Sequence, residues 1–210
     1  MRQTECNEIE VSFQGVGRRE IVAKFDGGQL SSDGGGLLLR EVDRRTGLLA
    51  EFAACFRDYR SAAMVEHSVS SMIRQRVMGL ALGYEDLNDH DQLRHDPLIA
   101  TLVEKSDPTQ ALAGKSTLNR LELSKDGQGE DRYKKIVYDE AKIDRFFVNA
   151  FLKAHQEPPK RIVLDLDTTD DEIHGGQEGR FFHGYYGSYC YLPLYVFCGE
   201  FLLCARLRQA

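Results

Sequence analysis

The sequence predicts an α+β fold in which an α-rich region leads into three consecutive strands. Apolar residues recur at helical spacing through much of residues 31–157, as at Val65, Val69 and Met72. After Pro158-Pro159 the composition changes to β-branched and apolar runs, "RIVLDLD", "SYCYLPLYVFCG" and "EFLLCARLR", which are typical of strands. We therefore expect a short β or irregular segment over 1–30, a helical region over 31–157, and the start of a sheet domain over 158–210.

The first half of the chain predicts a hairpin followed by helices. Residues 9–30 alternate loosely between glycines, which favours a short hairpin. A helix is expected to begin after the glycines at 34–36, with Asp33 as its N-cap, to break near Gly47 and to resume to about Phe56. A second helix covers residues 65–80 and stops at Gly83.

Shorter helices and one long helix follow. Residues 86–104 read as short helices divided at Asp96-Pro97, because a residue before proline avoids the α region. "KSTLNRLEL" predicts a helix capped by Ser116, and residues 131–155 predict a long amphipathic helix. The "GE" at 199–200 predicts a hairpin between the last two strands. Three strands with apolar residues on both faces need helices to cover them.

Composition sets broad limits on function. The sequence has no 18-residue apolar run and no secretory signal at its start, so a cytoplasmic protein is expected. Five scattered cysteines without a C-x-x-C pair favour reduced thiols over disulfides or a zinc site. A formal net charge of −6 gives no general attraction to nucleic acid, although a local basic face can still bind phosphates.

The densest basic group lies in the helical region. Its arginines could face a DNA backbone, where each neutralised phosphate adds affinity. Acidic residues are interspersed, so an ordinary charged surface is an equal alternative. The DNA-binding candidates are Arg40, Arg44, Arg45, Arg74 and Arg76.

Two other motifs favour structural roles. "LAGKSTLNR" lacks the glycine that a phosphate-binding loop needs five positions before Gly114, where Thr109 stands. His90 and His95 are five apart, so on a helix they point about 140° from each other, and a solvated helix end is favoured over a metal site.

An acidic run follows the first predicted strand of the sheet domain. Its carboxylates are Asp165, Asp167, Asp170, Asp171 and Glu172, and no Lys or Arg falls between Arg161 and Arg180. Side chains alternate along a strand, so Asp165 and Asp167 share one face about 7 Å apart. Carboxylate pairs of this kind suit Mg²⁺ or Mn²⁺. The other three acids lie beyond the strand, where a solvated turn explains them without chemistry.

Two further interpretations of the acidic run remain. A calcium loop starting at Asp167 is disfavoured because Glu172 stands where glycine should make the turn. The pattern D-x-D-x-T of Asp165, Asp167 and Thr169 resembles haloacid-dehalogenase-like phosphohydrolases, which pair an aspartate nucleophile with an acid/base aspartate. That family usually opens with this strand, whereas about 160 residues precede it here.

Four segments together resemble bacterial insertion-sequence transposases with a group-1 DDE domain. They are "FDGGQLSSDGGGLLLREVDRRTGLL", "GYEDLNDHDQLRHDPL", "LAGKSTLNRLE" and "LDLDTTDDEIHGGQEGRFFHGYYGSYCYLPLYVF", in order from about residue 25 onward. The resemblance implies a ribonuclease-H-like catalytic domain: a strand ending in an aspartate, two more antiparallel strands, and a later second aspartate and glutamate. These carboxylates would hold two Mg²⁺ (or Mn²⁺) ions for strand cleavage and transfer at the terminal inverted repeats of DNA. A homodimer is a candidate assembly for this reaction.

The resemblance also assigns residues and exposes a departure. It makes Asp167 the catalytic metal ligand, with Asp165 as the fallback, and Thr168, Thr169, Gln177 and Glu178 near-site candidates. The regions that would carry the second aspartate and the glutamate are absent from the sequence. We therefore expect a truncated ribonuclease-H-like domain that binds metal weakly or not at all and is inactive alone; a non-catalytic DNA-binding remnant is the alternative.

Overall fold

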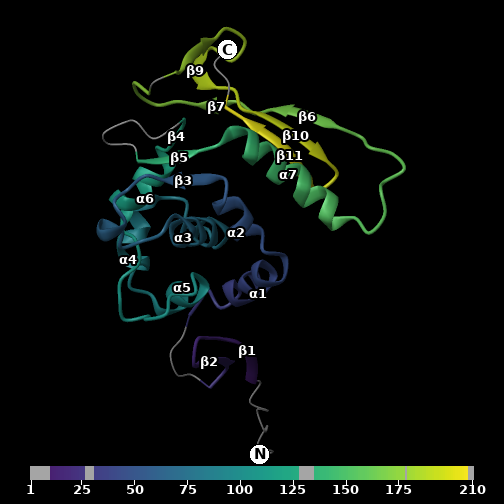
Figure 1. The fold of residues 1–210 in the computed structure, drawn as a ribbon. Coiled ribbons are helices and arrows are strands. Elements are labelled where there is room, and N and C mark those ends of the chain that lie inside the picture. The colour runs from purple at the N-terminus through teal and green to yellow at the C-terminus, as the bar shows by residue number, and fades with distance from the viewer. Residues whose placement is uncertain (1–9, 27–30, 128–134, 178, 208–210) are drawn as a thin grey trace, which may run out of the picture. The chain divides into compact units, whose positions relative to one another are not determined.

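The chain divides into two compact units, residues 1–139 and residues 140–210. A computed structural model describes residues 10–26, 31–127, 135–177 and 179–207, and Figure 1 labels the elements along them. The boundary expected from the sequence lies at 157/158. The helix that precedes that boundary instead belongs to the second unit, because it packs on a strand there.

The first unit opens with the predicted hairpin. Strands β1 (Glu10–Val16) and β2 (Arg19–Lys24) pair antiparallel. Gly17 makes the turn with a φ of 61°, which glycine adopts without strain. Side chains on one side of the hairpin, including Phe13 and Ile21, pack against the helices' core.

The first two helices are divided where the sequence predicted. Helix α1 (Gly36–Thr46) ends at Gly47, whose φ is 71°, and α2 (Leu48–Ala53) follows at once. The predicted Asp33 N-cap is wrong. The cap position is Gly35 without a side-chain hydrogen bond, and Asp33 Oδ2 instead accepts the Tyr84 hydroxyl at 2.8 Å.

Helix α3 (Val69–Ala81) lies between the remaining helices of this unit. Ser68 caps its start by accepting the Ser71 backbone N–H, and its C-cap is Leu82, immediately before Gly83. The 3₁₀ turn η1 (Ala62–Met64) precedes it. The predicted helix over residues 65–80 is thus confirmed, starting one turn later.

The region around Asp96-Pro97 forms short helices, as predicted. They are η2 (Leu87–Asp89), α4 (His90–Leu93) and α5 (Pro97–Leu102). Asp96 Oδ1 caps α5 by accepting the Leu98 N–H at 2.7 Å. Helix α6 (Lys115–Glu122) also exists, but Ser116 is not its cap: Gly114 holds that position. The orphan Lys115 N–H donates to Asp91 Oδ1 at 3.1 Å, so the carboxylate of a distant residue replaces the expected hydroxyl.

The predicted long helix over 131–155 is wrong in its first part. Residues 128–134 lie outside the described residues, and Ile136–Tyr138 form strand β5. This strand pairs antiparallel with β3 (Phe56–Asp58) and parallel with β4 (Lys125–Asp126). Ile136 and Val137 are both buried. Pairing with β3 and burial outweigh the helical spacing that these apolar residues share with the helix after them.

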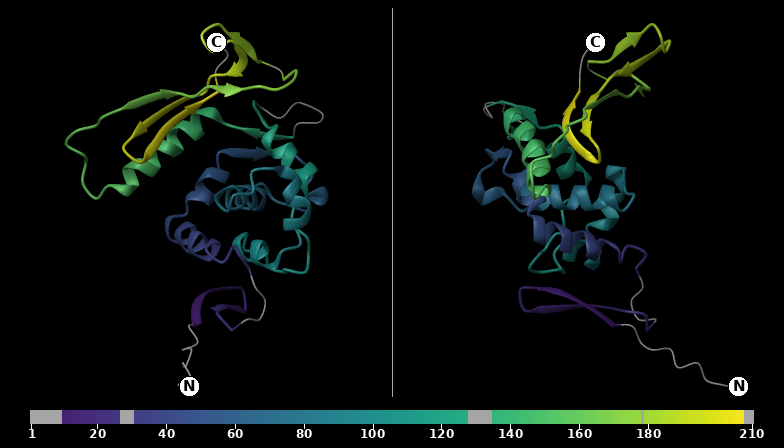
Figure 2. Two further views of the ribbon diagram at one scale, coloured as in Figure 1. Left: turned by 180° about the vertical axis from the view of Figure 1, so that it is seen from behind. Right: turned by 90° about the vertical axis from the view of Figure 1, so that its right-hand side faces the viewer.

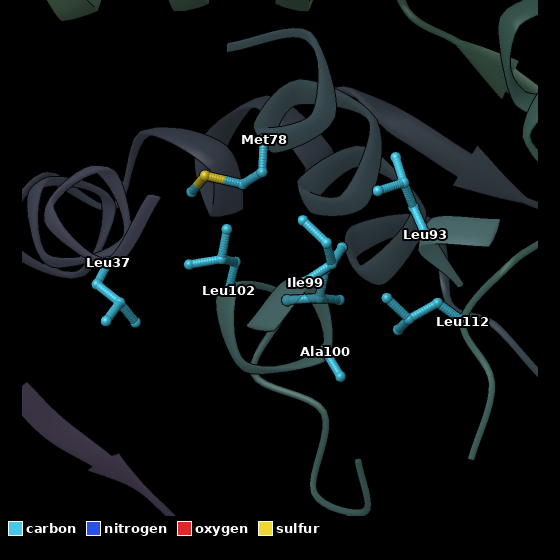
Figure 3. Packing of buried hydrophobic residues seen from close by; sticks show 8 residues of the cluster. Leu37, Met78, Leu93, Ile99, Ala100, Leu102 and Leu112 are labelled. Atoms are coloured by element: carbon cyan, nitrogen blue, oxygen red, sulfur yellow. The ribbon is translucent and has the colours of Figure 1, made fainter. Parts of the chain in front are cut away.

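Helix α3 contributes to two hydrophobic clusters. Figure 3 shows the first, in which α5 residues meet Met78 of α3 and Leu37 of α1. The second joins Val69, Met72 and Ile73 of α3 to α6 and β5. Its full membership is Val69, Met72, Ile73, Ala113, Leu118, Leu121 and Ile136. The unit is therefore held together by one helix that buries two faces.

The second unit contains helix α7 and two small sheets. One has the order β11-β10-β6, with every pair antiparallel; the other has the order β7-β9-β8. Figure 2 shows the green helix and the green and yellow strands of this unit in two further views. The elements are α7 (Glu140–Ala154), β6 (Asp165–Thr168), β7 (Asp171–Glu172), β8 (Phe181–His183), β9 (Ser188–Tyr191), β10 (Leu194–Cys198) and β11 (Phe201–Arg206).

Two strand predictions change in extent. "RIVLDLD" forms a strand only from Asp165 onward, and Ile162, Val163 and Leu164 are exposed. "SYCYLPLYVFCG" is two strands that belong to different sheets, β9 and β10, separated at Leu192-Pro193 because proline cannot donate to a ladder. The hairpin at 199–200 is confirmed, with Gly199 at a φ of 56°.

Helix α7 covers strand β11. Phe151 is buried, and its ring meets that of Phe201 with centroids 5.5 Å apart. Arg206 of β11 donates to Asp144 at 2.5 Å and pairs with Glu140 at 3.0 Å. The apolar stripe of the helix thus supplies the covering layer that the sheet needs at this strand. None of the helices in the described part of the chain is long and apolar enough to cross a membrane.

Candidate functional site

Strand β6 carries the two predicted metal-binding carboxylates. Asp165 lies opposite Phe197 of β10 and Asp167 lies opposite Tyr195, so the ladder fixes the backbone of both. Alternation along the strand places both carboxylates on one face, about 7 Å apart. All of β6 is exposed. The structure therefore brings Asp165 and Asp167 together on a rigid, water-accessible support.

The remaining acids of the run do not form the expected turn. Asp171 and Glu172 make the short strand β7, which pairs with Tyr191 and Cys190 of β9. Both acids are exposed. Burial raises the pKa of the Cys190 thiol, and a hydrogen bond with Asp170 raises it further. Strand β7 is only two residues long, which is too short for a strand pattern to be recognised in the sequence.

The near-site candidates lie around the end of β6. Thr168 is its last residue and faces Leu194, and the Thr169 N–H donates to the Pro193 carbonyl at 3.3 Å. Gln177 is exposed and belongs to no strand. Glu178 lies outside the described residues. The two threonines are thus anchored next to Asp167 by the backbone, and nothing comparable positions Gln177.

The carboxylate oxygens of Asp165 and Asp167 on β6 are of the chemical type that binds a hard divalent cation. Carboxylate oxygens are the ligands that Mg²⁺ and Mn²⁺ prefer. Within the part of the chain that the structure describes, however, no three His, Cys, Asp or Glu side chains gather in an arrangement that could hold a metal ion. Asp165 and Asp167 can accordingly contribute a pair of ligands to a metal site.

The arginine candidates are mostly engaged within the first unit. Arg40 is only 1 % exposed, donates to the Gln14 carbonyl at 2.8 Å and pairs with Glu41 and Glu104, so it offers no surface to a phosphate. Arg44 and Arg74 also bind Glu104, at 2.5 and 2.9 Å. Buried Arg40 is a structural residue that joins α1 to the hairpin.

The other two arginine candidates differ in their surroundings. Arg76 pairs with Glu122 and donates to the carbonyls of Tyr84 and Glu85. Arg45 is exposed, and among the described residues it has no ion pair. Of the five arginine candidates, Arg45 is therefore the best placed to reach a nucleic-acid backbone.

His90 is a core residue, contrary to the expected solvated helix end. It is fully buried, and its Nδ1 lies 3.2 Å from Gln75 Nε2. Gln75 also donates to the Ala113 carbonyl and accepts the Ala113 N–H. Burial lowers the pKa of His90, so the fold favours the neutral form of the imidazole. His95 is exposed, and the two histidines do not form a site.

A hairpin rich in aromatic residues, which was not predicted from the sequence, lies beside the acidic strand β7. Strands β8 and β9 pair antiparallel, with Phe182 opposite Tyr189, and Tyr185 and Tyr186 lie at the turn. The sequence signal was "FFHGYYGSYCY", in which glycines flank the turn between two aromatic runs.

The sequence of this chain matches one known protein family. Residues 13–210 match the family described as transposase DDE domain group 1. No curated protein and no solved structure matches the chain significantly. The match covers nearly all of both units and favours a transposase over a haloacid-dehalogenase-like phosphohydrolase. Members of the family generally use divalent metals, and transposases bind DNA. The chain belongs to the transposase DDE domain group 1 family.

Proposed function

We propose that this chain carries part of the active site of a transposase that cleaves and joins DNA strands with divalent metal ions. The observation that carries the proposal is the exposed pair Asp165 and Asp167 on β6, in a chain of this family. Asp167 is the metal ligand, and Asp165 on the same face assists or replaces it. Mg²⁺ or Mn²⁺ held there would polarise a phosphate oxygen and stabilise the charge that develops on it.

The sheet supports a ribonuclease-H-like assignment for the second unit. The acidic strand β6 comes first in the chain, and β10 and β11 follow as two antiparallel strands in the spatial order β11-β10-β6. This is the strand-acid-strand-strand arrangement that the resemblance implies. Among the described strands β6 pairs only with β10, so its other edge is available to a further strand.

Two carboxylates are too few for two metal ions. Tight binding of hard cations needs several anionic oxygens at fixed positions, and the described residues group no more than a pair. We therefore propose that this polypeptide alone binds metal weakly and does not carry out strand transfer. In that state it acts as a DNA-binding protein, in which Arg45 contacts the backbone of terminal repeat DNA. A homodimer would present the exposed arginine twice.

A metal titration tests the role of Asp167. Mn²⁺ added to the chain is followed by electron paramagnetic resonance, because bound Mn²⁺ loses the signal of the free ion. We expect weak binding that Asp167→Asn abolishes and Asp165→Asn reduces. Asp171→Asn is the matched control, since Asp171 is an equally exposed acid on the neighbouring strand β7.

Three results would count against the proposal. Binding that survives Asp167→Asn unchanged would remove the assigned ligand. Tight binding of two ions by the wild-type chain would contradict its proposed inactivity. Hydrolysis of a simple phosphate monoester, lost in Asp165→Asn, would instead restore the phosphohydrolase interpretation.

A further inference from the structure

The aromatic hairpin, residues 180–191, presents an unusually exposed set of rings. Tyr185 at its turn is 86 % exposed, and Phe182 and Tyr189 on the strands are 57 % and 46 % exposed. Large aromatic side chains normally bury 150–250 Å² each, so leaving several of them in water is unfavourable unless they bind something. The exposure is the first indication of a binding surface.

The rings form two groups: Phe182 contacts Tyr189, and Tyr185 contacts Tyr186, which in turn contacts His183. Phe182 and Tyr189 face each other across the strands with centroids 5.5 Å apart, and Tyr185 meets Tyr186 at 5.1 Å. The Arg180 guanidinium lies over the Tyr189 ring, 4.4 Å from its centroid. Edge-to-face packing holds these rings in fixed orientations while about half or more of the Phe182, Tyr185 and Tyr189 side chains remains exposed. Rigid, accessible π faces are what a flat ligand needs.

The charge of the hairpin favours an anionic, planar ligand. No Asp or Glu occurs from residue 179 to residue 199, and Arg180 and His183 lie on the β8 side of the hairpin, whereas the exposed acids Asp171 and Glu172 lie on β7 at the other edge of the sheet. A protein partner with a complementary apolar surface would match the rings but would not need the positive charge. Unpaired nucleobases instead match both features, because each base offers a π face and carries a phosphate that a nearby guanidinium attracts.

The hairpin is connected to the strand that carries Asp167 through β7 and β10, since it belongs to the other sheet of the unit. Tyr191 at the base of the hairpin pairs with Asp171, and the Thr169 N–H donates to Pro193, two residues beyond β9. Strand β10 then places Tyr195 opposite Asp167. A DNA strand with a phosphate at Asp167 therefore has the aromatic hairpin within the same unit and along the same connected backbone.

We propose that the aromatic hairpin binds single-stranded DNA by stacking unpaired bases on Tyr185, Phe182 and Tyr189. The inference rests on the proposed function, because it assigns a binding surface for bases of the DNA whose phosphate the β6 site would cleave. Intact duplex DNA is not the ligand of this surface, since its bases stack on one another and show no free faces. The hairpin thus selects strand ends or locally opened DNA.

The experiment measures binding of an oligonucleotide by the full chain without metal. The probe is a single strand of about 12 nucleotides that contains 2-aminopurine, whose fluorescence is quenched when it stacks on an aromatic ring. Chelator in the buffer makes the measurement independent of Asp167. We expect quenching by the wild-type chain, and a Kd raised about tenfold in Tyr185→Ala, the loss of one stacked base.

Matched variants separate stacking from other contacts. Tyr185→Phe keeps the ring and should bind like wild type, whereas Tyr185→Leu keeps apolar area without a π face and should bind like Tyr185→Ala. Tyr59→Ala removes an exposed tyrosine of the first unit and should change nothing. Circular dichroism of each variant verifies that it is folded, and Phe182→Leu provides a second test on the strand.

Three results would overturn the proposal. The first is equal binding of the oligonucleotide by Tyr185→Ala and by wild type. The second is equal quenching by single strands and by a matched duplex. The third is a change in sedimentation of Tyr185→Ala, which would assign the hairpin to contact with a second copy or another protein. A failed metal titration with intact stacking would reject only the role of Asp167. The reverse combination would reject only the hairpin.

Discussion

Replacing Glu104 should destabilise the first unit more than any ordinary surface substitution. Its carboxylate binds Arg44, Arg74 and the buried Arg40, at 2.5, 2.9 and 3.4 Å. Burial opposes ionisation of Glu104, but hydrogen bonds from Arg44 and Arg74 outweigh it and lower its pKa. Glu104 also has a φ of 61°, a left-handed conformation that a residue with a Cβ adopts at a cost.

The expected magnitude follows from these contacts. The two partly exposed pairs are each worth about 0.2–1 kcal/mol. Leaving the buried Arg40 guanidinium short of one anion adds about 1–3 kcal/mol, less than a full buried charge costs, because Glu41 and backbone carbonyls still compensate it. Glu104→Ala should therefore lower the free energy of unfolding by about 2–4 kcal/mol. Glu104→Gly should lose about 1 kcal/mol less, since glycine accepts the positive φ.

Urea unfolding measured by far-ultraviolet circular dichroism gives these free energies. Hydrogen exchange of peptides from α1 and α5 assigns the transition to the first unit. Glu66→Ala, an exposed glutamate on the same unit, is the control and should stay within about 0.5 kcal/mol of wild type. The reasoning is refuted if Glu104→Ala matches that control, or if Glu104→Gly is the less stable of the two Glu104 variants.

Two further predictions concern buried titratable groups. As pH falls below the ordinary histidine pKa of 6.5, His90 takes up a proton in the unfolded chain but resists protonation in the fold, because its pKa there is lowered. The free energy of unfolding should therefore decrease, by at most about 1.4 kcal/mol per pH unit for this group. His67, whose pKa burial also lowers, acts with the same sign, so His90→Gln should make the pH dependence shallower without removing it; an unchanged slope would contradict this. Cys190 is fully buried and its pKa is raised by burial, so maleimide labelling followed by mass spectrometry should modify it well after Cys198 and Cys204. Equal labelling rates would show that β9 is open to solvent.

Local patterns in the sequence predicted the parts of the fold that local physics determines. The break at Gly47 and the start at Asp96-Pro97 are decided by backbone conformations that only nearby residues control. The same holds for the 199–200 hairpin. The Ser116 cap was mispredicted because a carboxylate from Asp91, distant in sequence, binds the N–H group instead.

Long-range pairing accounts for the larger errors. Ile136 and Val137 have the spacing of the following helix, yet they pair with β3, a segment about 80 residues earlier in the chain. The arginine cluster was ambiguous for the same reason: Arg40 and Arg74 are bound to Glu104, which lies 64 and 30 positions away. Charge interspersed along the sequence could not show which arginines are neutralised in space.

The sequence alone determined that a carboxylate pair stands on one face of a strand, because the period of two is a property of the backbone. It also determined the transposase resemblance, which the family match confirmed. Only the tertiary structure decided that β6 is fully exposed, that Arg40 is buried, and that an aromatic hairpin pairs with the acidic strand β7. Exposure and adjacency depend on which distant segments pair and pack, and the residues of one segment do not specify its partners.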